Sequence, residues 1–333
     1  MKIVLCGNHN PYFFNSVQCR EKALRELGHE VIFFDKRKFL IPGKIRKIFP
    51  ALHAWDLRRM EKELALLVRV AWPDLFLVIG GGISPDVVKE ISARDVPTLL
   101  WTTDAPFDVP GLQKEAAAYD HVICSGSEAV PIVAEVKGSS RVDWIPFAAD
   151  PKIHCPAMLS SEDKAKYGRE VAFVGSYYPN RQKTLESISD FRLGIWGPSW
   201  DRAEKTPLAS LAEARRVNVA EWTKIYTAAN IVVVVHYRDG ETPCDQASPK
   251  LFEALSCGAF VLCDDQKDAR TLFQDKKHLV FFKDNDDLRA KVEYYLPRFE
   301  ERRRIAAAGR EIVLARHTYH NRMEEMLKIV VKG

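Results

Sequence analysis

The sequence lacks the segments by which exported and membrane-spanning proteins are usually identified. Its first residues, MKIVLCGNHN, contain a short apolar run that turn-forming residues interrupt at once, so they do not resemble a secretory leader. No apolar stretch approaches the roughly 20 residues that a helix needs to span a bilayer. We therefore expect a cytoplasmic protein that is neither exported nor inserted into a membrane.

Cysteine pairs and a strong charge of either sign are also missing. None of the seven cysteines forms a C-x-x-C pair, which predicts reduced, mostly buried thiols and argues against a zinc site. The 49 basic and 45 acidic residues leave a net charge of only +4, which does not indicate nucleic-acid binding. The cysteines are Cys6, Cys19, Cys124, Cys155, Cys244, Cys257 and Cys263.

Short apolar runs alternate with helical stretches along the whole chain. A length of 333 residues exceeds what one core of roughly 250–300 residues accommodates, so two domains are expected. Runs that are apolar nearly throughout are typical of parallel strands with helices on both faces of the sheet. The first half contains such runs at 3–7, 31–35, 75–80, 98–103, 121–126 and 141–147, and the second half at 171–176, 191–197, 231–237, 259–265 and 278–283.

This alternation predicts two doubly wound α/β domains in tandem. We expect residues 148–169, with two prolines and a charge cluster, to form the interdomain linker. Long helices are predicted at about 285–298, 299–315 and 319–331. Ligands bind at the carboxyl ends of parallel strands, so a cleft between the two domains is the expected site.

Three segments of the first half follow predicted strands and are candidates for binding a ligand. Gly7, Asn8 and His9 form a turn before a helix but lack the complete G-x-G-x-x-G pattern. The run Gly80–Gly82, which includes Gly81, can bring backbone amides to an anion, or can simply form a permissive turn. Asp104 can orient an acceptor hydroxyl or accept its proton, or can cap the bend before Pro106.

The second half has a candidate diphosphate clamp after its first strand. Gly175 and Ser176 end that strand in a turn of small residues, and Arg181 follows at the expected start of a helix. Backbone amides at a helix start and a guanidinium both suit a phosphate. The alternative is that Arg181 is an ordinary surface arginine.

The segment from Asp245 to Gly258 carries the most specific pattern. Ser248 is predicted to cap a helix whose first residue is Pro249, and Leu251 is expected to face the core. The amides at this helix start can face phosphate or sugar oxygens. Glu253, in the second turn, can accept hydrogen bonds from both hydroxyls of a ribose.

At these residues the chain resembles the retaining GT-B glycosyltransferases, and among them the spore-maturation (CgeB-like) group. The resemblance implies two Rossmann-like domains facing a central cleft, over 1–150 and 151–318, with a C-terminal helix, 319–333, that packs back on the first domain. The matching pieces are ALRELGHEVIFFD (23–35), LVIGGG (77–82), WTTDAP (101–106), FVGSYYPNR (173–181), SPKLFEALSCGAFVLCDD (248–265) and HTYHNRMEEML (317–327).

The resemblance also implies roles for single residues. In these enzymes a Glu-x7-Glu motif handles the donor; here Glu253 matches the second acid and Asp245 stands at the first, one methylene shorter. Arg181 and Lys250 would neutralise the diphosphate, and Asp104 would lie on the acceptor side and, with Asp245, act in catalysis. The remaining donor contacts are assigned to Gly175, Ser176, Ser248, Pro249 and Leu251, and the acceptor side to Gly7, Asn8, His9, Gly81 and Gly82.

The expected activity is transfer of a sugar, hexosyl-like, from a nucleoside-diphosphate sugar to an unidentified acceptor, with retention. No cofactor or metal is expected, because Arg181, Lys250 and a helix N-terminus can supply the positive charge that a departing diphosphate needs; the pairs Asp264-Asp265 and Asp286-Asp287 are expected to be caps or solvated turns. The alternatives are a sugar-nucleotide epimerase of the same fold, a homologue that binds nucleotide sugar without transferring it, and a two-domain sugar-binding protein.

Residues 36–62 form a basic amphipathic stretch. Nine lysines and arginines stand there against Asp56 and Glu61, interleaved with apolar residues such as Phe49 and Trp55. Such a stretch suits a weak contact with an anionic membrane surface or an anionic acceptor. The alternative is a solvated loop and helix beside the cleft.

Overall fold

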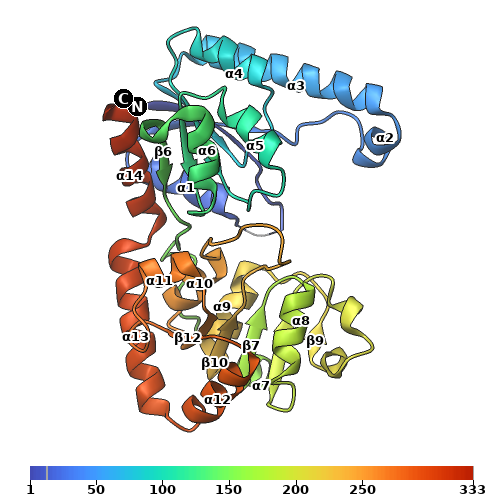
Figure 1. Cartoon of the computed structure of the whole chain (residues 1–333), viewed down its shortest axis with the longest axis vertical. Coiled ribbons are helices and arrows are strands. Elements are labelled where there is room, and N and C mark those ends of the chain that lie inside the picture. Colours follow the sequence, from blue (N-terminus) through green and yellow to red (C-terminus); the bar gives the residue numbers. More distant parts are fainter. Residues whose placement is uncertain (13, 333) are drawn as a thin grey trace. The chain divides into compact units, whose positions relative to one another are not determined.

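The structure, a computed structural model, describes residues 1–12 and 14–332 and divides into two compact units. The first comprises Met1–Pro146 together with the residues from Met323 on, and the second comprises Phe147–Arg322. Each unit is built around one parallel sheet with flanking helices (Figure 1). Two Rossmann-like α/β units are what the alternating pattern predicted.

The sheet of the first unit has six parallel strands in the order β2-β1-β3-β4-β5-β6. The inner strands β3 and β4 are buried along their whole length, which explains their continuous apolar sequences. The strands are β1 (Lys2–Gly7), β2 (Glu30–Asp35), β3 (Leu75–Ile79), β4 (Thr98–Thr102), β5 (His121–Cys124) and β6 (Val142–Trp144).

Helices connect these strands and cover the sheet. The side chain of Asn15 caps the first of them in a capping box with Gln18, and Gly28, at a φ of 86°, follows its end. The helices are α1 (Ser16–Glu26), α2 (Gly43–Ile48), α3 (Pro50–Ala71), α4 (Pro85–Ser92), α5 (Val109–Ala116) and α6 (Ala129–Lys137), to which the later turns of α14 (Tyr319–Lys332) are added.

The second unit also has six parallel strands, in the order β12-β11-β10-β7-β8-β9. Five of them lie within the predicted runs and are shorter than those runs at one or both ends, while the short β9 was not predicted. They are β7 (Val171–Val174), β8 (Leu193–Trp196), β9 (Ala212–Glu213), β10 (Ile231–Val234), β11 (Val261–Asp264) and β12 (Val280–Phe282).

The helices of the second unit include one that the sequence analysis missed. They are α7 (Ser161–Tyr167), α8 (Pro179–Glu186), α9 (Val219–Ala228), α10 (Pro249–Ser256), α11 (Lys267–Leu272), α12 (Asn285–Tyr295), α13 (Phe299–Arg316) and the start of α14. The segment 148–169, which was expected to be the interdomain linker, contains α7, with a capping box between Ser160 and Asp163. Ala149, moreover, pairs with Thr318 in a β-bridge.

The strand order places a topological switch point in each sheet. In the second sheet, β7 and β10 are neighbours from which the chain winds in opposite directions, towards β9 on one side and β12 on the other. Connections on opposite faces leave a crevice at the carboxyl ends of such strands, where ligands bind in open α/β sheets. The residues that follow β7 and β10 therefore define the candidate site.

Candidate functional site

Gly175 and Ser176 follow β7 at this switch point, in a tightly packed turn. The Gly175 amide donates to the carbonyl oxygen of Trp196 (2.9 Å), and its own carbonyl accepts from the indole nitrogen of Trp200 (2.8 Å). A Cβ added to Gly197 would lie 1.9 Å from the Gly175 oxygen, so two backbone segments meet here at a distance that only glycine permits. The turn therefore holds Ser176 in place at the carboxyl end of the sheet.

Arg181, in the first turn of α8, spans the ends of β7 and β10. Its Nε donates to the carbonyl of Val235 and its Nη1 to that of Ser176, both at 2.9 Å. Burial lowers the pKa of this guanidinium below its ordinary value, although an arginine remains charged. Among the described residues no hydrogen bond of its Nη2 group is present, which leaves that group for a ligand.

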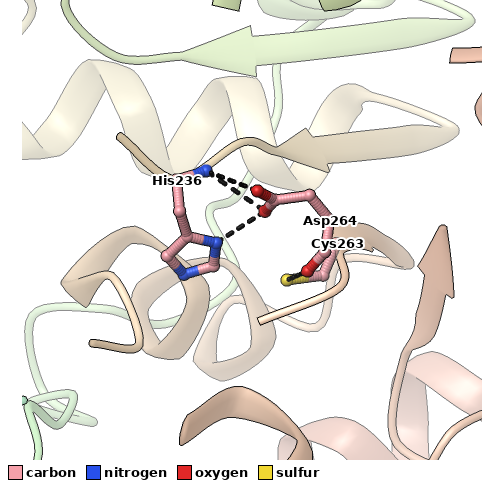
Figure 2. A group of neighbouring side chains, drawn as sticks. All are labelled: His236, Cys263 and Asp264. Carbon is pink, nitrogen blue, oxygen red and sulfur yellow. Dashed lines mark hydrogen bonds and ion pairs between the residues drawn. The ribbon is translucent and has the colours of Figure 1, made fainter. Parts of the chain in front are cut away.

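His236 lies two residues after β10, was not among the predicted site residues, and connects three segments of the second unit. Its Nδ1 lies 2.5 Å from Oδ1 of Asp264 at the end of β11, and its Nε2 lies 2.9 Å from the backbone nitrogen of Ser248 (Figure 2 shows the pair with Asp264). Because Ser248 donates to Nε2, we assign the proton of the neutral ring to Nδ1. The carbonyl of His236 accepts from the side-chain amide of Asn180 (2.7 Å).

Helix α10 begins as predicted, but its first amides are already used. Ser248 is the N-cap and its hydroxyl accepts from the Lys250 amide at 3.3 Å. The Leu251 amide donates to the Ser248 carbonyl (3.0 Å), and Pro249 has no amide hydrogen. The expectation of free amides at this helix start is therefore wrong for its first three residues. The Leu251 side chain is fully buried in the core, as expected.

Glu253 is a buried carboxylate paired with a cation. Its Oε2 lies 2.8 Å from Nζ of Lys250, and that ammonium lies 3.7 Å from the centre of the Trp222 ring. Burial alone would raise the pKa of Glu253, but the charges of Lys250 and His154 outweigh it and hold the pKa below its ordinary value. The carboxylate is thus ionised, as an acceptor of ribose hydroxyl groups must be.

Asp245 lies in a different environment from Glu253. It borders an open hollow of about 890 Å³ between the 238–245 loop and the start of α11, where its Oδ2 pairs with Nζ of Lys267 at 2.7 Å. Glu253 is not among the residues that line this hollow. Asp265 borders the same hollow and pairs with Arg270, so it lies in a partly exposed ion pair at the end of β11.

The pair Asp264-Asp265 does not behave as two solvated turn residues. Asp264 is buried and accepts from both the backbone nitrogen and Nδ1 of His236, so that part of the expectation is wrong. His236, Cys263 and Asp264 form the one group among the described residues whose ligand atoms lie close enough to hold a metal ion (Figure 2). The imidazole already uses both nitrogens, and burial raises the pKa of Cys263 well above its ordinary value, so the residues do not fit a metal site.

In the first unit the three-glycine turn after β3 contacts two charged side chains of the chain itself, those of Lys36 and Glu115. Gly80, Gly81 and Gly82 adopt φ angles of 71°, 61° and 87°, and Nζ of Lys36 donates to the carbonyls of Gly80 (3.2 Å) and Gly81. The Gly82 amide donates to the carboxylate of Glu115 (2.5 Å). The Gly82 amide therefore does meet an anion, but that anion is the carboxylate of Glu115 in the chain itself, while the carbonyls of Gly80 and Gly81 bind the Lys36 cation.

The turn after β1 is held against α1. The side-chain amide of Asn15 donates to the carbonyl of Asn8 (2.7 Å), and a Cβ on Gly7 would lie 2.7 Å from Val17. His9 lies 2.7 Å from a carboxylate oxygen of Glu21 on α1. Gly7, Asn8 and His9 thus lie at the switch point of the first sheet, and their assignment to the acceptor side stays a prediction.

Asp104 is exposed at the end of β4. It borders a hollow of about 330 Å³ that Gly81 and Glu115 also line. The capping of the following helix falls to Asp108, whose side chain accepts from the Gly111 amide at 3.0 Å. Capping of α5 therefore does not explain Asp104, which stays a candidate for the acceptor side.

His236 and Asn180 are the site residues that sequence reasoning missed. His236 lies near the end of the apolar run at 231–237, two residues after β10, where a polar side chain enters the carboxyl edge of the sheet. That position was the available signal. Asn180 offered none, because its contact with His236 joins residues 56 apart in sequence.

Comparisons with known proteins agree with this geometry. The family described as "Glycosyl transferase-like" matches residues 167–328, which is most of the second unit. Sucrose-phosphate synthase from Thermosynechococcus elongatus is similar in structure, with a TM-score of 0.75 and 14% identity, over 100% of this chain and 98% of that one. HepE from Anabaena, solved in complex with UDP and glucose, has a TM-score of 0.66 and 12% identity over all of both chains.

The fold and the family match define the class of protein: this chain is a glycosyltransferase with the GT-B fold. Within that class it is similar to spore protein CgeB of Bacillus subtilis (strain 168), with 21% identity over 266 residues, which cover 75% of this chain and 80% of CgeB. In the part of the chain that the structure describes, no helix combines the length and the apolar character needed to cross a membrane.

Proposed function

We propose that this enzyme transfers a glycosyl group from a nucleoside-diphosphate sugar that binds at the carboxyl ends of β7 and β10. The observation that carries the proposal is the position of Arg181. Its guanidinium joins the two strands at the switch point and keeps one amino group uncommitted among the described residues. A planar cation at that place suits two negatively charged phosphates.

The phosphates would contact the turn after β7. Ser176 is partly exposed beside Arg181 and can add its amide and hydroxyl to the cation, while Gly175 lets a ligand approach the backbone closely. Lys250 is near the helix start but pairs with Glu253. Its ammonium would therefore contact the phosphates through the N–H donors that this pair leaves. Together these groups would stabilise the negative charge of the departing nucleoside diphosphate.

The ribose would be bound by Glu253. Its ionised carboxylate has one oxygen paired with Lys250, and the other can accept hydrogen bonds from the vicinal hydroxyls. HepE, whose fold this chain shares, was solved with UDP and glucose, so UDP is the first nucleotide to test.

The reaction breaks the bond between C1 of the sugar and the β-phosphate oxygen and forms one between C1 and an acceptor hydroxyl oxygen. The bonding electrons leave with the nucleoside diphosphate, and the hydroxyl proton passes to a base. We assign acceptor orientation to Asp104 and a supporting role at the sugar to Asp245, and we expect retention at C1. Because Arg181 and Lys250 supply positive charge and the Ser176 amide supplies a hydrogen-bond donor, a divalent metal is not needed for leaving-group departure.

Thermal unfolding in the presence of UDP, GDP, ADP and their sugars tests the proposal. Binding to the folded state stabilises it by about 2.7 kcal/mol at a hundredfold excess over Kd, so the correct nucleotide should raise Tm. Arg181→Gln should abolish that rise, whereas Arg303→Gln, which removes an exposed arginine of α13, should leave it intact. If no nucleoside diphosphate raises the Tm of the wild type, the donor site is wrong.

A second measurement separates transfer from other activities at the same site. Sugar nucleotide incubated with the enzyme alone should show slow hydrolysis at most. Once an acceptor is found, NMR of the glycoside product should show the same anomeric configuration as the donor. A new sugar epimer would contradict a transferase, and an inverted product would contradict retention. The same assay with and without EDTA tests independence from divalent metal.

A further inference from the structure

The exposed apolar side chains of this protein are concentrated around α2 and α3. Of the 18 large hydrophobic side chains that are exposed among the described residues, nine lie between residues 40 and 72. Soluble proteins scatter such side chains singly, so their accumulation over one segment needs an explanation. The nine are Leu40, Ile45, Ile48, Phe49, Leu52, Trp55, Leu66, Val70 and Trp72.

Helix α3 has two opposite faces. Met60, Leu64 and Val68 are buried in the core of the first unit. Trp55, at 55% exposure, and Leu66, at 50%, project from the other side with the spacing that places residues on one helix face. The exposed face also carries Arg58, Lys62 and Arg69 and borders a shallow hollow of about 530 Å³. Apolar and cationic side chains thus share one surface.

The acidic residues of the segment are directed inward. Asp56 is buried, accepts from the amides of Leu40 and Ile41, and has its pKa lowered despite burial by those bonds and by Arg59. Glu61 is buried and accepts from the amide of Ser84 (2.7 Å). Within 36–72 this leaves Glu63 as the exposed acid, against the exposed cations Arg37, Lys38, Lys44, Lys47, Arg58, Lys62 and Arg69.

We propose that this α2–α3 surface, formed by the exposed residues of 37–72, binds a bilayer that carries anionic lipids. Figure 1 shows α2 beyond the start of α3, away from the strands of the first sheet, so both helices can approach a surface. Lysines and arginines contact the headgroups, and Phe49, Trp55 and Leu66 enter the boundary of the acyl chains. In the structure, exposed apolar side chains continue beyond the basic stretch of 36–62 along α3, as far as Val70.

Charge and apolar area together distinguish this partner from the alternatives. A second copy of the chain would place two strongly positive surfaces against each other, which opposes association. An acidic polymer in solution would match the charge but would leave the aromatic and aliphatic side chains in water. An anionic bilayer satisfies both, and this inference does not depend on the proposed donor site.

Co-sedimentation of the full chain with vesicles tests the proposal. The protein should sediment with vesicles of phosphatidylcholine and phosphatidylglycerol, but not with phosphatidylcholine alone, and salt should weaken the binding. Arg58→Gln/Lys62→Gln should lower the vesicle partition coefficient about 25-fold, at about fivefold for each basic residue. The control Lys276→Gln/Lys277→Gln removes two exposed lysines of the second unit and should change little.

The apolar contribution is tested separately. Trp55→Gln/Leu66→Gln should weaken vesicle binding, whereas Met158→Gln/Phe299→Gln, which changes two exposed apolar residues elsewhere, should not. Absence of vesicle binding overturns the proposal. The proposal is also overturned if Trp55→Gln/Leu66→Gln binds vesicles as well as the wild type does and both proteins bind soluble polyglutamate equally. Binding would then depend on charge alone and would indicate an acidic macromolecule as the partner. A vesicle-free dimer in sedimentation velocity that Trp55→Gln/Leu66→Gln dissociates would indicate a second copy.

Discussion

The imidazole of His236 and the carboxylate of Asp264 form a buried pair, 2.5 Å apart, that joins the ends of the neighbouring strands β10 and β11. The other nitrogen of the same ring accepts from the backbone of Ser248, the N-cap of α10. One side chain therefore determines where the helix that carries Glu253 begins relative to the sheet. The position of the proposed ribose contact depends on this connection.

Two substitutions of His236 separate its two hydrogen bonds. His236→Asn can still donate to Asp264 but has no acceptor for the Ser248 amide, so the free energy of unfolding should fall by about 1–3 kcal/mol. His236→Gln, whose carbonyl reaches further, should retain the acceptor and lose less. Urea unfolding measures both, and the Kd for UDP should rise more in the Asn variant. Equal losses would contradict a specific role for the Ser248 contact.

Removing the carboxylate of Glu253 should weaken donor binding. Hydrogen bonds to charged groups contribute about 1.5–3 kcal/mol, so Glu253→Ala should raise the Kd for UDP about 10- to 100-fold. Glu253→Gln keeps one carbonyl acceptor, so its Kd for UDP should lie between those of Glu253→Ala and the wild type. Calorimetric titration measures these constants. An unchanged Kd in Glu253→Ala would remove the ribose assignment.

Asp245 should affect turnover more than binding, because its pair with Lys267 lies in the open hollow that Glu253 does not line. We expect Asp245→Ala to lower kcat for consumption of the sugar nucleotide while the Kd for UDP stays within about twofold. Asp245→Glu, which restores the longer acid of the related motif, serves as the matched variant and should retain activity. Equal kcat in wild type and Asp245→Ala would exclude a catalytic role.

The close approach at Gly197 should make that position intolerant of any side chain. Gly197→Ala places a Cβ 1.9 Å from the Gly175 oxygen, so the turn that holds Ser176 must shift. Gly240→Ala is the control: no atom lies within 4 Å of its added Cβ, and its φ of 86° alone costs about 1–2 kcal/mol. Urea unfolding should show the larger loss for Gly197→Ala. Equal losses would contradict the packing argument.

His317 should make stability depend on pH. Burial and the neighbouring Arg322 cation lower its pKa to about 3, whereas the unfolded chain titrates near its ordinary value of 6.5. The contribution of His317 to the free energy of unfolding is therefore complete above pH 6.5. It is lost as the pH falls, at about 1.4 kcal/mol per pH unit once the pH is well below 6.5. His317→Asn keeps an acceptor for Arg322 without titrating. Its free energy of unfolding should fall less than that of the wild type between pH 7 and 5.5.

Most of the fold could be predicted from the sequence because its elements have local causes. Continuous apolar runs such as that at 231–237 indicate buried parallel strands, and Ser248 before Pro249 indicates a helix start. The helix α7 was missed because its seven residues are too few to show a period, although Ser160 and Asp163 carry its capping box.

The site was predicted less completely, because hydrogen-bond partners are chosen in space. Glu253 could be located from its place in α10, but its pairing with Lys250 and the stacking of that lysine on Trp222 could not. The glycines of 80–82 indicated a turn with unusual backbone angles, and only the approach of Lys36 decided that their carbonyls would face a cation.

The sequence by itself determined two parallel α/β units and the start of α10, since apolar periodicity and capping act between residues close in the chain. The tertiary structure alone decided that His236 meets Asp264, 28 residues away, and that Asp56 and Glu61 lie buried while Trp55 and Leu66 remain exposed. The reason is that the folded neighbours of a polar side chain, rather than its sequence neighbours, decide whether its charge is satisfied or left facing water.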